Sequence, residues 1–164
     1  MKEYLKYSGI LLALILIQKT VINFIDVTEF KITPDVVLIG LVYVGIKRGK
    51  ITGSISGFLS GLILDIFSFS FIGLMALSKT VAGFVSGFFN ENTKMERYLN
   101  SYIFILIVTF CSLINNTVYF LFYFQGTNLV LFDIVIRYIV PTTIYTALFS
   151  IFPVLFARRR RFAR

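Results

Sequence analysis

Charged side chains interrupt the apolar stretches of this chain at only a few places. Asp65 ends the stretch GSISGFLSGLILD, and Lys79 follows it after a short turn segment. Asp133 and Arg137 are four residues apart, so they can pair along one face of a helix. Charges in hydrocarbon are costly, so they are either paired or mark a path for protons or ions. The two pairs are therefore the first candidates for chemistry.

Nucleophilic and metal chemistry have little support in the residue types present. The chain has no His and a single Cys, Cys111. A His-based triad, a His or Cys metal site and a disulfide within the chain are therefore excluded. No evident base stands beside any Ser or Thr, and no phosphate-binding glycine loop is present. We expect no enzyme, no cofactor and no metal.

Glycines recur at four-residue spacing on the two segments that carry Asp65 and Lys79. Residues four apart lie on nearly the same helix face, so each set forms a groove for close helix packing. In an antiparallel hairpin, the position numbers of facing residues have a constant sum. A sum of 144 brings together two glycine pairs and one acid–base pair, namely Gly57 with Gly87, Gly61 with Gly83, and Asp65 with Lys79. Gly53 continues the first set.

The predicted Asp65–Lys79 pair has two interpretations. As a structural pair, each side chain neutralises the other near the outer membrane face. As a relay, Asp65 would need further titratable groups along a path toward the cytoplasmic end of its helix, and none is present there. We therefore expect the structural pair. Asn115 and Asn116, in the middle of a later apolar run, are expected to hydrogen-bond to a neighbouring helix.

Six apolar segments must position these side chains. A helix that crosses the bilayer needs roughly 20 residues, with a range of about 17–25. The second segment begins at Pro34, a favourable first-turn residue, and the last contains Pro141 and Pro153, where it can kink. The segments predicted as membrane helices are about 5–24, 34–46, 51–68, 73–89, 99–124 and 130–157.

Composition places the chain among helical membrane proteins. Of its 164 residues 57% are hydrophobic, and the mean hydropathy is +0.86. A soluble fold of this size could not hide so much apolar surface. The long apolar runs do not fit the short alternating segments of a β-barrel. The sequence thus predicts one all-α integral membrane domain, 1–164, with six spans.

The basic residues orient these spans. Net charge is +8, and the Lys and Arg residues gather in alternate connections, which a cytoplasmic N-terminus places on the inside together with the C-terminus. This distribution accounts for the positive net charge, so nucleic-acid binding is not needed to explain it. The C-terminal run ARRRRFAR is expected to contact anionic lipid. The less favoured alternative is a docking site for an acidic partner.

Three stretches resemble the core of the bacterial rod shape-determining protein MreD family. They are PDVVLIGLVYVGIKRG, GFLSGLILDIFSFSFIG and ALSKTVAGFVSG, within about 34–87. One departure is Phe69, at a turn position where the family often has Gly. The matching positions are Pro34, Gly57, Phe58, Gly61, Leu64, Asp65, Ser68, Gly73 and Pro153.

The resemblance implies a non-enzymatic scaffold of the cell-elongation machinery in the bacterial inner membrane. Such a scaffold would bind MreC and help couple cytoplasmic MreB filaments to the lateral-wall peptidoglycan synthases. The family is also similar in fold to the substrate-binding components of energy-coupling-factor transporters, so a vitamin-binding component is the alternative. The candidate partner-contact residues are Pro34, Asp35, Asp133, Arg137, Arg158, Arg159, Arg160 and Arg161.

Overall fold

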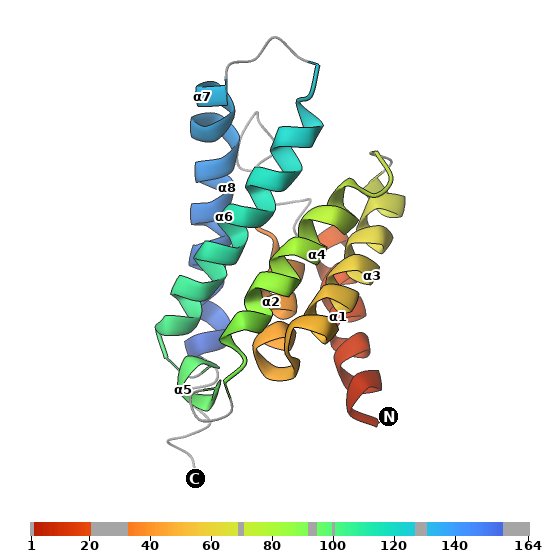
Figure 1. Cartoon of the computed structure of the whole chain (residues 1–164), viewed down its shortest axis with the longest axis vertical. Helices are drawn as coiled ribbons and strands as arrows, with labels where there is room; N and C mark the ends of the chain where they lie inside the picture. Colours follow the sequence, from red (N-terminus) through yellow and green to blue (C-terminus); the bar gives the residue numbers. More distant parts are fainter. Residues whose placement is uncertain are drawn as a thin grey trace.

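All regular structure in the described part of the chain is helical (Figure 1). The computed structural model describes residues 2–20, 33–68, 71–91, 95–99, 101–126 and 131–155. The α-helices are α1 Lys2–Thr20, α2 Val36–Arg48, α3 Lys50–Ser68, α4 Leu74–Ser86, α5 Met95–Leu99, α6 Ile103–Tyr123, α7 Leu131–Ile134 and α8 Val140–Phe149. A 3-10 turn, η2 Gly87–Phe89, extends α4, and a π-helical turn, η3 Val135–Ile139, joins α7 to α8.

Each of the six predicted segments coincides with helical structure, but their lengths differ. Three helices are long and apolar enough to cross a membrane, namely α3, α6 and the continuous helix Leu131–Leu155. The apolar helices Tyr7–Thr20 and Leu74–Phe89 are shorter. Helix α2 has 13 residues, so it is about 20 Å long, against roughly 30 Å of hydrocarbon. Six complete crossings therefore remain a prediction.

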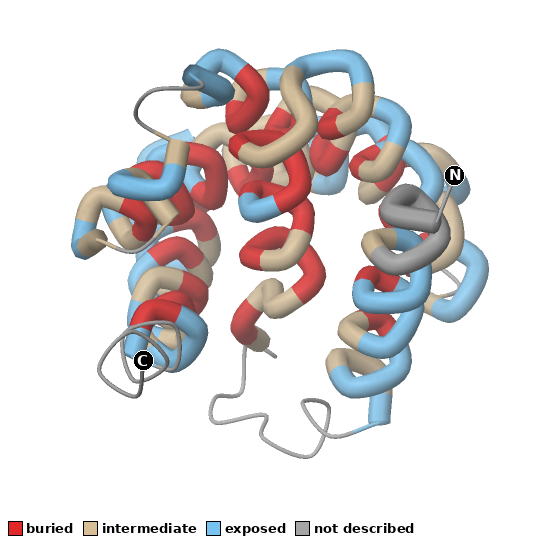
Figure 2. Tube along the Cα trace, turned by 90° about the horizontal axis from the view of Figure 1, so that it is seen from below, coloured by how far each residue is buried: buried red, intermediate tan, exposed pale blue. Residues whose placement is uncertain are grey.

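Helix α2 is the centre of the bundle. It contacts α1, α3, α4, α6 and α8. Its side chains are the most completely buried in the described residues, because most of Val37 to Ile46 faces another helix rather than the outside. Figure 2 shows the same division, with buried residues on the inside of the bundle and exposed ones on its periphery.

Both ends of α2 are defined by specific residues. The Asp35 carboxylate accepts a hydrogen bond from the Leu38 backbone N–H at 2.9 Å, which satisfies a donor that lacks a partner within the helix. At the other end Gly49 has a φ of 86°, a left-handed conformation that glycine adopts without strain. Asn90 donates to the Ile46 carbonyl at 2.7 Å and so satisfies a terminal acceptor.

The α3–α4 hairpin is packed through its glycines. A Cβ added at Gly53 would collide with the Gly83 backbone, and one added at Gly57 would collide with the Lys79 backbone. Gly61 is equally close to the backbone at Ala76. These two helices make the most extensive contact in the molecule. Small residues at the interface therefore let the two backbones approach, as predicted.

The register of this hairpin differs from the prediction. Gly53 faces Gly83 and Gly57 faces Lys79, and both pairs of position numbers add up to 136 instead of 144. The residue of α4 that faces a given residue of α3 is thus eight positions earlier than predicted, a shift of about two helical turns. Gly87 packs against the backbone of Lys50, at the start of α3. The predicted facing pairs Gly57–Gly87, Gly61–Gly83 and Asp65–Lys79 are therefore wrong.

The last long helix contains one wide turn. Pro141 has no N–H, and its ring would clash with the carbonyl four residues earlier in a regular α-helix. The π-helical turn η3 precedes it, and the Val140 N–H donates to the carbonyl of Val135, five residues back. The Thr142 hydroxyl donates to the Tyr138 carbonyl at 2.6 Å. The wide turn thus accommodates the proline within a continuous helix.

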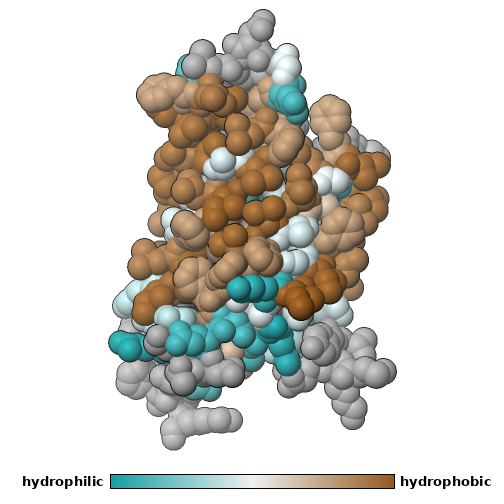
Figure 3. All heavy atoms as spheres, in the orientation of Figure 1, coloured by the Kyte–Doolittle hydropathy of each residue, from teal (hydrophilic) through white to brown (hydrophobic). Residues whose placement is uncertain are grey.

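Hydrophobic residues cover most of the outer surface. Large apolar side chains on α3, α6 and the continuous helix Leu131–Leu155 are exposed, among them Ile66, Leu106 and Phe152. Figure 3 shows this apolar surface above a hydrophilic band at the end of the bundle where α1 begins. Apolar area of this extent requires a lipid or protein environment.

Candidate functional site

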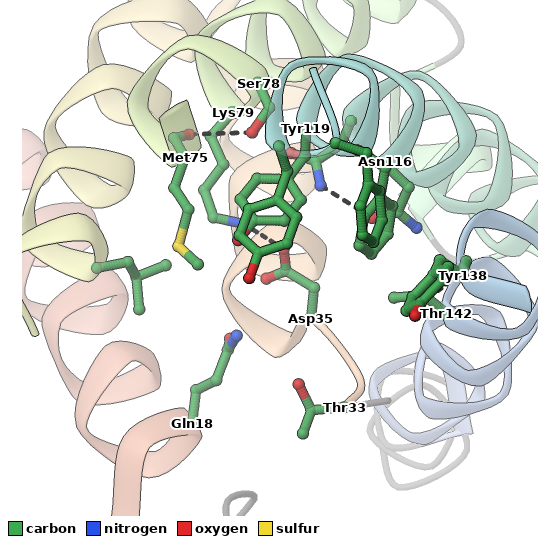
Figure 4. Close-up of a pocket in the computed structure, with 15 residues that line it drawn as sticks. Gln18, Thr33, Asp35, Met75, Ser78, Lys79, Asn116, Tyr119, Tyr138 and Thr142 are labelled. Atoms are coloured by element: carbon green, nitrogen blue, oxygen red, sulfur yellow. Dashed lines mark hydrogen bonds and ion pairs between the residues drawn. The ribbon is translucent and has the colours of Figure 1, made fainter. Parts of the chain in front are cut away.

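A cavity of about 460 Å³ lies between helices α1 to α4 on one side of the bundle and helices α6 to α8 on the other (Figure 4). It is bordered by the ends of α1 and α3, the starts of α2, α4 and α8, the second half of α6, and η3. All of these borders lie at the end of the bundle remote from the start of α1. Its lining residues are Gln18, Thr33, Asp35, Leu64, Met75, Ser78, Lys79, Asn115, Asn116, Tyr119, Phe120, Tyr123, Phe124, Tyr138 and Thr142.

An ion pair between Lys79 and Asp35 stands on the cavity wall. The Lys79 ammonium donates to the Asp35 carboxylate, and the two side chains are 3% and 14% exposed. The Asp35 backbone N–H also donates to the Thr146 hydroxyl at 3.1 Å. Asp35 therefore joins α2 to both α4 and α8. A buried lysine without such a partner would leave an uncompensated charge inside the bundle.

Two adjacent amides form a second polar group in the cavity. Asn115 donates to the Asn116 side-chain oxygen at 3.2 Å, and Asn116 donates to Thr143 on α8 at 3.0 Å and to Ser112 at 3.3 Å. The predicted interhelical hydrogen bond is thus made by Asn116. The Asn115 side-chain oxygen is buried, and no hydrogen-bond donor reaches it from the described residues. A buried acceptor of this kind is suited to a donor supplied by a bound group.

Aromatic rings form the wall on the side of α6 and η3. Tyr138 packs between Phe120 and Phe124, with ring centroids 5.5 and 4.8 Å away. Tyr119 stacks on Tyr123 at 5.6 Å. These rings offer a large apolar face, while the part of the lining from α4 and the start of α2 carries the ion pair. Such a combination can hold an apolar group and orient it through a few polar contacts.

Asp65 is not paired with Lys79, contrary to the sequence prediction. Its carboxylate accepts hydrogen bonds from the backbone N–H groups of Gly73, Met75 and Ala76, at 2.9, 3.0 and 3.1 Å. These donors lie at the N-terminus of α4, where backbone N–H groups have no partner within the helix. Because the hairpin register is shifted by about two turns, Asp65 lies level with this terminus and Lys79 lies beyond its reach. The helix dipole further stabilises the buried carboxylate.

The other predicted partner-contact residues lie in different places. Pro34 is buried beside Asp35, just before α2. The Arg137 Nε lies 3.7 Å from the Asp133 Oδ1 in the predicted i, i+4 arrangement, and the two side chains are 60% and 44% exposed. The arginines of the C-terminal run lie outside the described residues; they are Arg158, Arg159, Arg160 and Arg161. Partner contact through any of these residues remains a prediction.

Several site residues were not singled out from the sequence. Gln18 accepts a hydrogen bond from the Val37 N–H at 2.9 Å, and Thr146 holds Asp35. Gly45 on α2 packs so closely against Ser86 that a Cβ would collide with its hydroxyl. A polar residue within an apolar run was the available signal for Gln18 and Thr146. Nothing in their spacing identifies their partners, which are 19 and 111 positions away.

Comparison with known proteins identifies one family. The model of a family described as rod shape-determining protein MreD matches residues 3–159, nearly the whole chain. No curated protein and no solved structure matches.

Proposed function

Since the chain belongs to the MreD family of rod shape-determining membrane proteins, we propose that it acts as a scaffold of the cell-elongation machinery. The family is one of structural shape-determination proteins and is not known for catalysis, and membership implies a role in rod-shape determination. In our proposal the protein lies in the bacterial inner membrane with both termini cytoplasmic. It binds MreC and helps couple MreB filaments to lateral-wall peptidoglycan synthesis.

The cavity carries the partner-binding part of this proposal. With the N-terminus inside, the cavity opens toward the outer side of the membrane, because it lies at the opposite end of α1. Its aromatic wall suits an apolar side chain of a partner, and the buried oxygen of Asn115 suits an N–H or O–H donor. We propose that a segment of MreC near the outer membrane surface inserts here.

The same cavity supports a second candidate function. Its volume falls in the range of small-molecule sites, about 300–1,000 Å³. A substrate-binding component of an energy-coupling-factor vitamin transporter, the fold to which the family is similar, would use such a cavity for its vitamin. The two functions differ in what occupies the cavity: a segment of a protein or a free small molecule.

Co-purification from mild detergent tests the proposal. The tagged chain is expressed together with MreC, and we expect MreC to be recovered with it. Tyr138→Ala removes a ring from the cavity wall and Asn115→Leu removes the buried acceptor, so each is expected to lower recovery about tenfold or more. Leu106→Ala, at a residue 69% exposed on the outer face of α6, is the matched control and should leave recovery unchanged.

Three results would contradict the scaffold assignment. The first is wild-type protein that folds but recovers no MreC. The second is recovery of an ATPase module with its coupling subunit. The third is a vitamin bound in the cavity. If MreC is recovered equally well by the cavity variants, the scaffold assignment holds but the cavity is not its binding site.

A further inference from the structure

Two cations and two tyrosines meet where α2 ends, opposite the cavity. The Lys47 ammonium donates to the Tyr43 hydroxyl at 3.3 Å and lies 5.4 Å from the centre of that ring. It also lies 5.9 Å from the ring of Tyr7 on α1, and the Arg48 guanidinium lies 5.1 Å from the same ring. We call Tyr7, Tyr43, Lys47 and Arg48 the α1–α2 basic cluster.

The start of α3 sets the depth of this cluster in the membrane. Helix α3 is long and apolar enough to cross the bilayer, and it begins at Lys50, with only Gly49 between it and the end of α2. In the proposed orientation the start of α3 lies at the cytoplasmic headgroup layer. The cluster, at the adjoining end of α2, therefore lies at the same level.

The cluster combines charge with neighbouring apolar surface. The Lys47 ammonium is held by its hydrogen bond to the Tyr43 hydroxyl, next to the guanidinium of Arg48. On α1, Ile10 lies one turn from Tyr7 and is 44% exposed, and Tyr43 itself is 36% exposed. Positive charge above exposed apolar side chains matches the two parts of a phospholipid.

We propose that the α1–α2 basic cluster binds the phosphate-bearing headgroup of an anionic phospholipid in the cytoplasmic leaflet. The two cations face the phosphate, and the acyl chains lie along the exposed apolar surface of α1. The inference rests on the proposed membrane orientation but not on partner binding in the cavity. Its residues do not include those of the C-terminal run ARRRRFAR.

The depth of the cluster favours a lipid over an acidic protein. A cytoplasmic protein would have to enter the headgroup layer to reach Lys47, whereas a lipid headgroup is already at that level. Tyrosine rings are also enriched at this membrane interface, where their hydroxyl groups meet polar headgroups. An acidic protein is therefore kept as an outcome of the test.

Native mass spectrometry of the full-length protein tests the proposal. The protein is purified in detergent with phosphatidylglycerol or phosphatidylcholine, and we expect bound phosphatidylglycerol to be preferred. Lys47→Gln should lower the bound fraction about fivefold, while Lys47→Arg should retain it. Lys50→Gln is the matched control, because Lys50 begins the next helix and lies over Phe88, outside the cluster. It should change binding less than twofold.

Four outcomes would overturn the lipid site. They are equal retention of the two lipids by the wild type, an equal loss in Lys50→Gln, displacement of the lipid by free glycerol phosphate, and an acidic protein recovered in place of lipid. If Lys47→Gln does not fold, Tyr43→Phe takes its place, since it removes the hydroxyl that orients Lys47. Unchanged lipid preference in that variant would also contradict the proposal.

Discussion

Lys79 and Asp65 illustrate how single buried charges find partners in this bundle. Each is almost completely buried, so each needs compensation. Lys79 pairs with Asp35 on another helix, whereas Asp65 accepts three backbone N–H groups at the start of α4. Sequence correctly predicts that both charges are compensated but pairs them with each other. The true partners depend on a shift of about two helical turns in the hairpin register.

A double-mutant cycle separates the two pairings at the residue scale. Asp35→Asn and Lys79→Met are made singly and together, and the free energy of unfolding is measured in detergent. We expect a coupling of roughly 1–3 kcal/mol, because each single change leaves its partner unpaired. The control cycle of Asp65→Asn with Lys79→Met should be additive within about 0.5 kcal/mol. Coupling in the control cycle alone would contradict the observed pairing.

At the scale of elements, the glycine seam of α3 and α4 is the feature that sequence spacing predicted best. The four-residue spacing of the glycines shows which face of each helix carries small residues. It does not determine the register. If one helix slides along the other by one turn, a small residue again faces the backbone of the partner helix. The turn before α4 decides between these registers: the chain returns alongside α3 before Leu74, so Asp65 can bind the helix start.

Replacing one seam glycine tests this packing. Gly57→Ala adds a Cβ that collides with the backbone of Lys79, so we expect destabilisation of about 1–3 kcal/mol. Gly9→Ala is the matched control, because it makes the same change in a helix where no atom lies within 4 Å of the added Cβ. It should be neutral or stabilising by up to about 1 kcal/mol. The measurement is thermal unfolding in detergent, and equal effects of the two variants would refute the seam.

For the whole molecule, the structure places the cavity and the α1–α2 basic cluster at opposite ends of the central helix α2. This arrangement separates an outward site for a partner from an inward site for lipid in the proposed orientation. Helix α2 contacts both sides of the bundle, so it links the two ends through a rigid, buried element. Loop composition predicted the orientation but contained no information on the cavity.

Cysteine labelling tests this orientation. Cys111 is the one cysteine and is fully buried, so a Cys111→Ser background allows new cysteines to be introduced one at a time. Gln125→Cys, at an exposed residue after α6, should react with a membrane-impermeant maleimide in intact spheroplasts. Arg97→Cys, exposed on α5, should react only after the membrane is opened. The reverse labelling pattern would show that the protein has the opposite orientation, with its cavity on the cytoplasmic side.

Sequence by itself determined the class of this protein, its helical segments, the small-residue faces and the family. These properties depend on composition and on spacing along one helix, which are local and can be counted. Tertiary structure alone decided the Asp35–Lys79 pair, the role of Asp65 and the cavity between helices far apart in sequence. The physical reason is that a helix surface offers several registers of similar packing. Packing of the surrounding helices against α2 selects one of these registers, and only then does each charge have a single partner within reach.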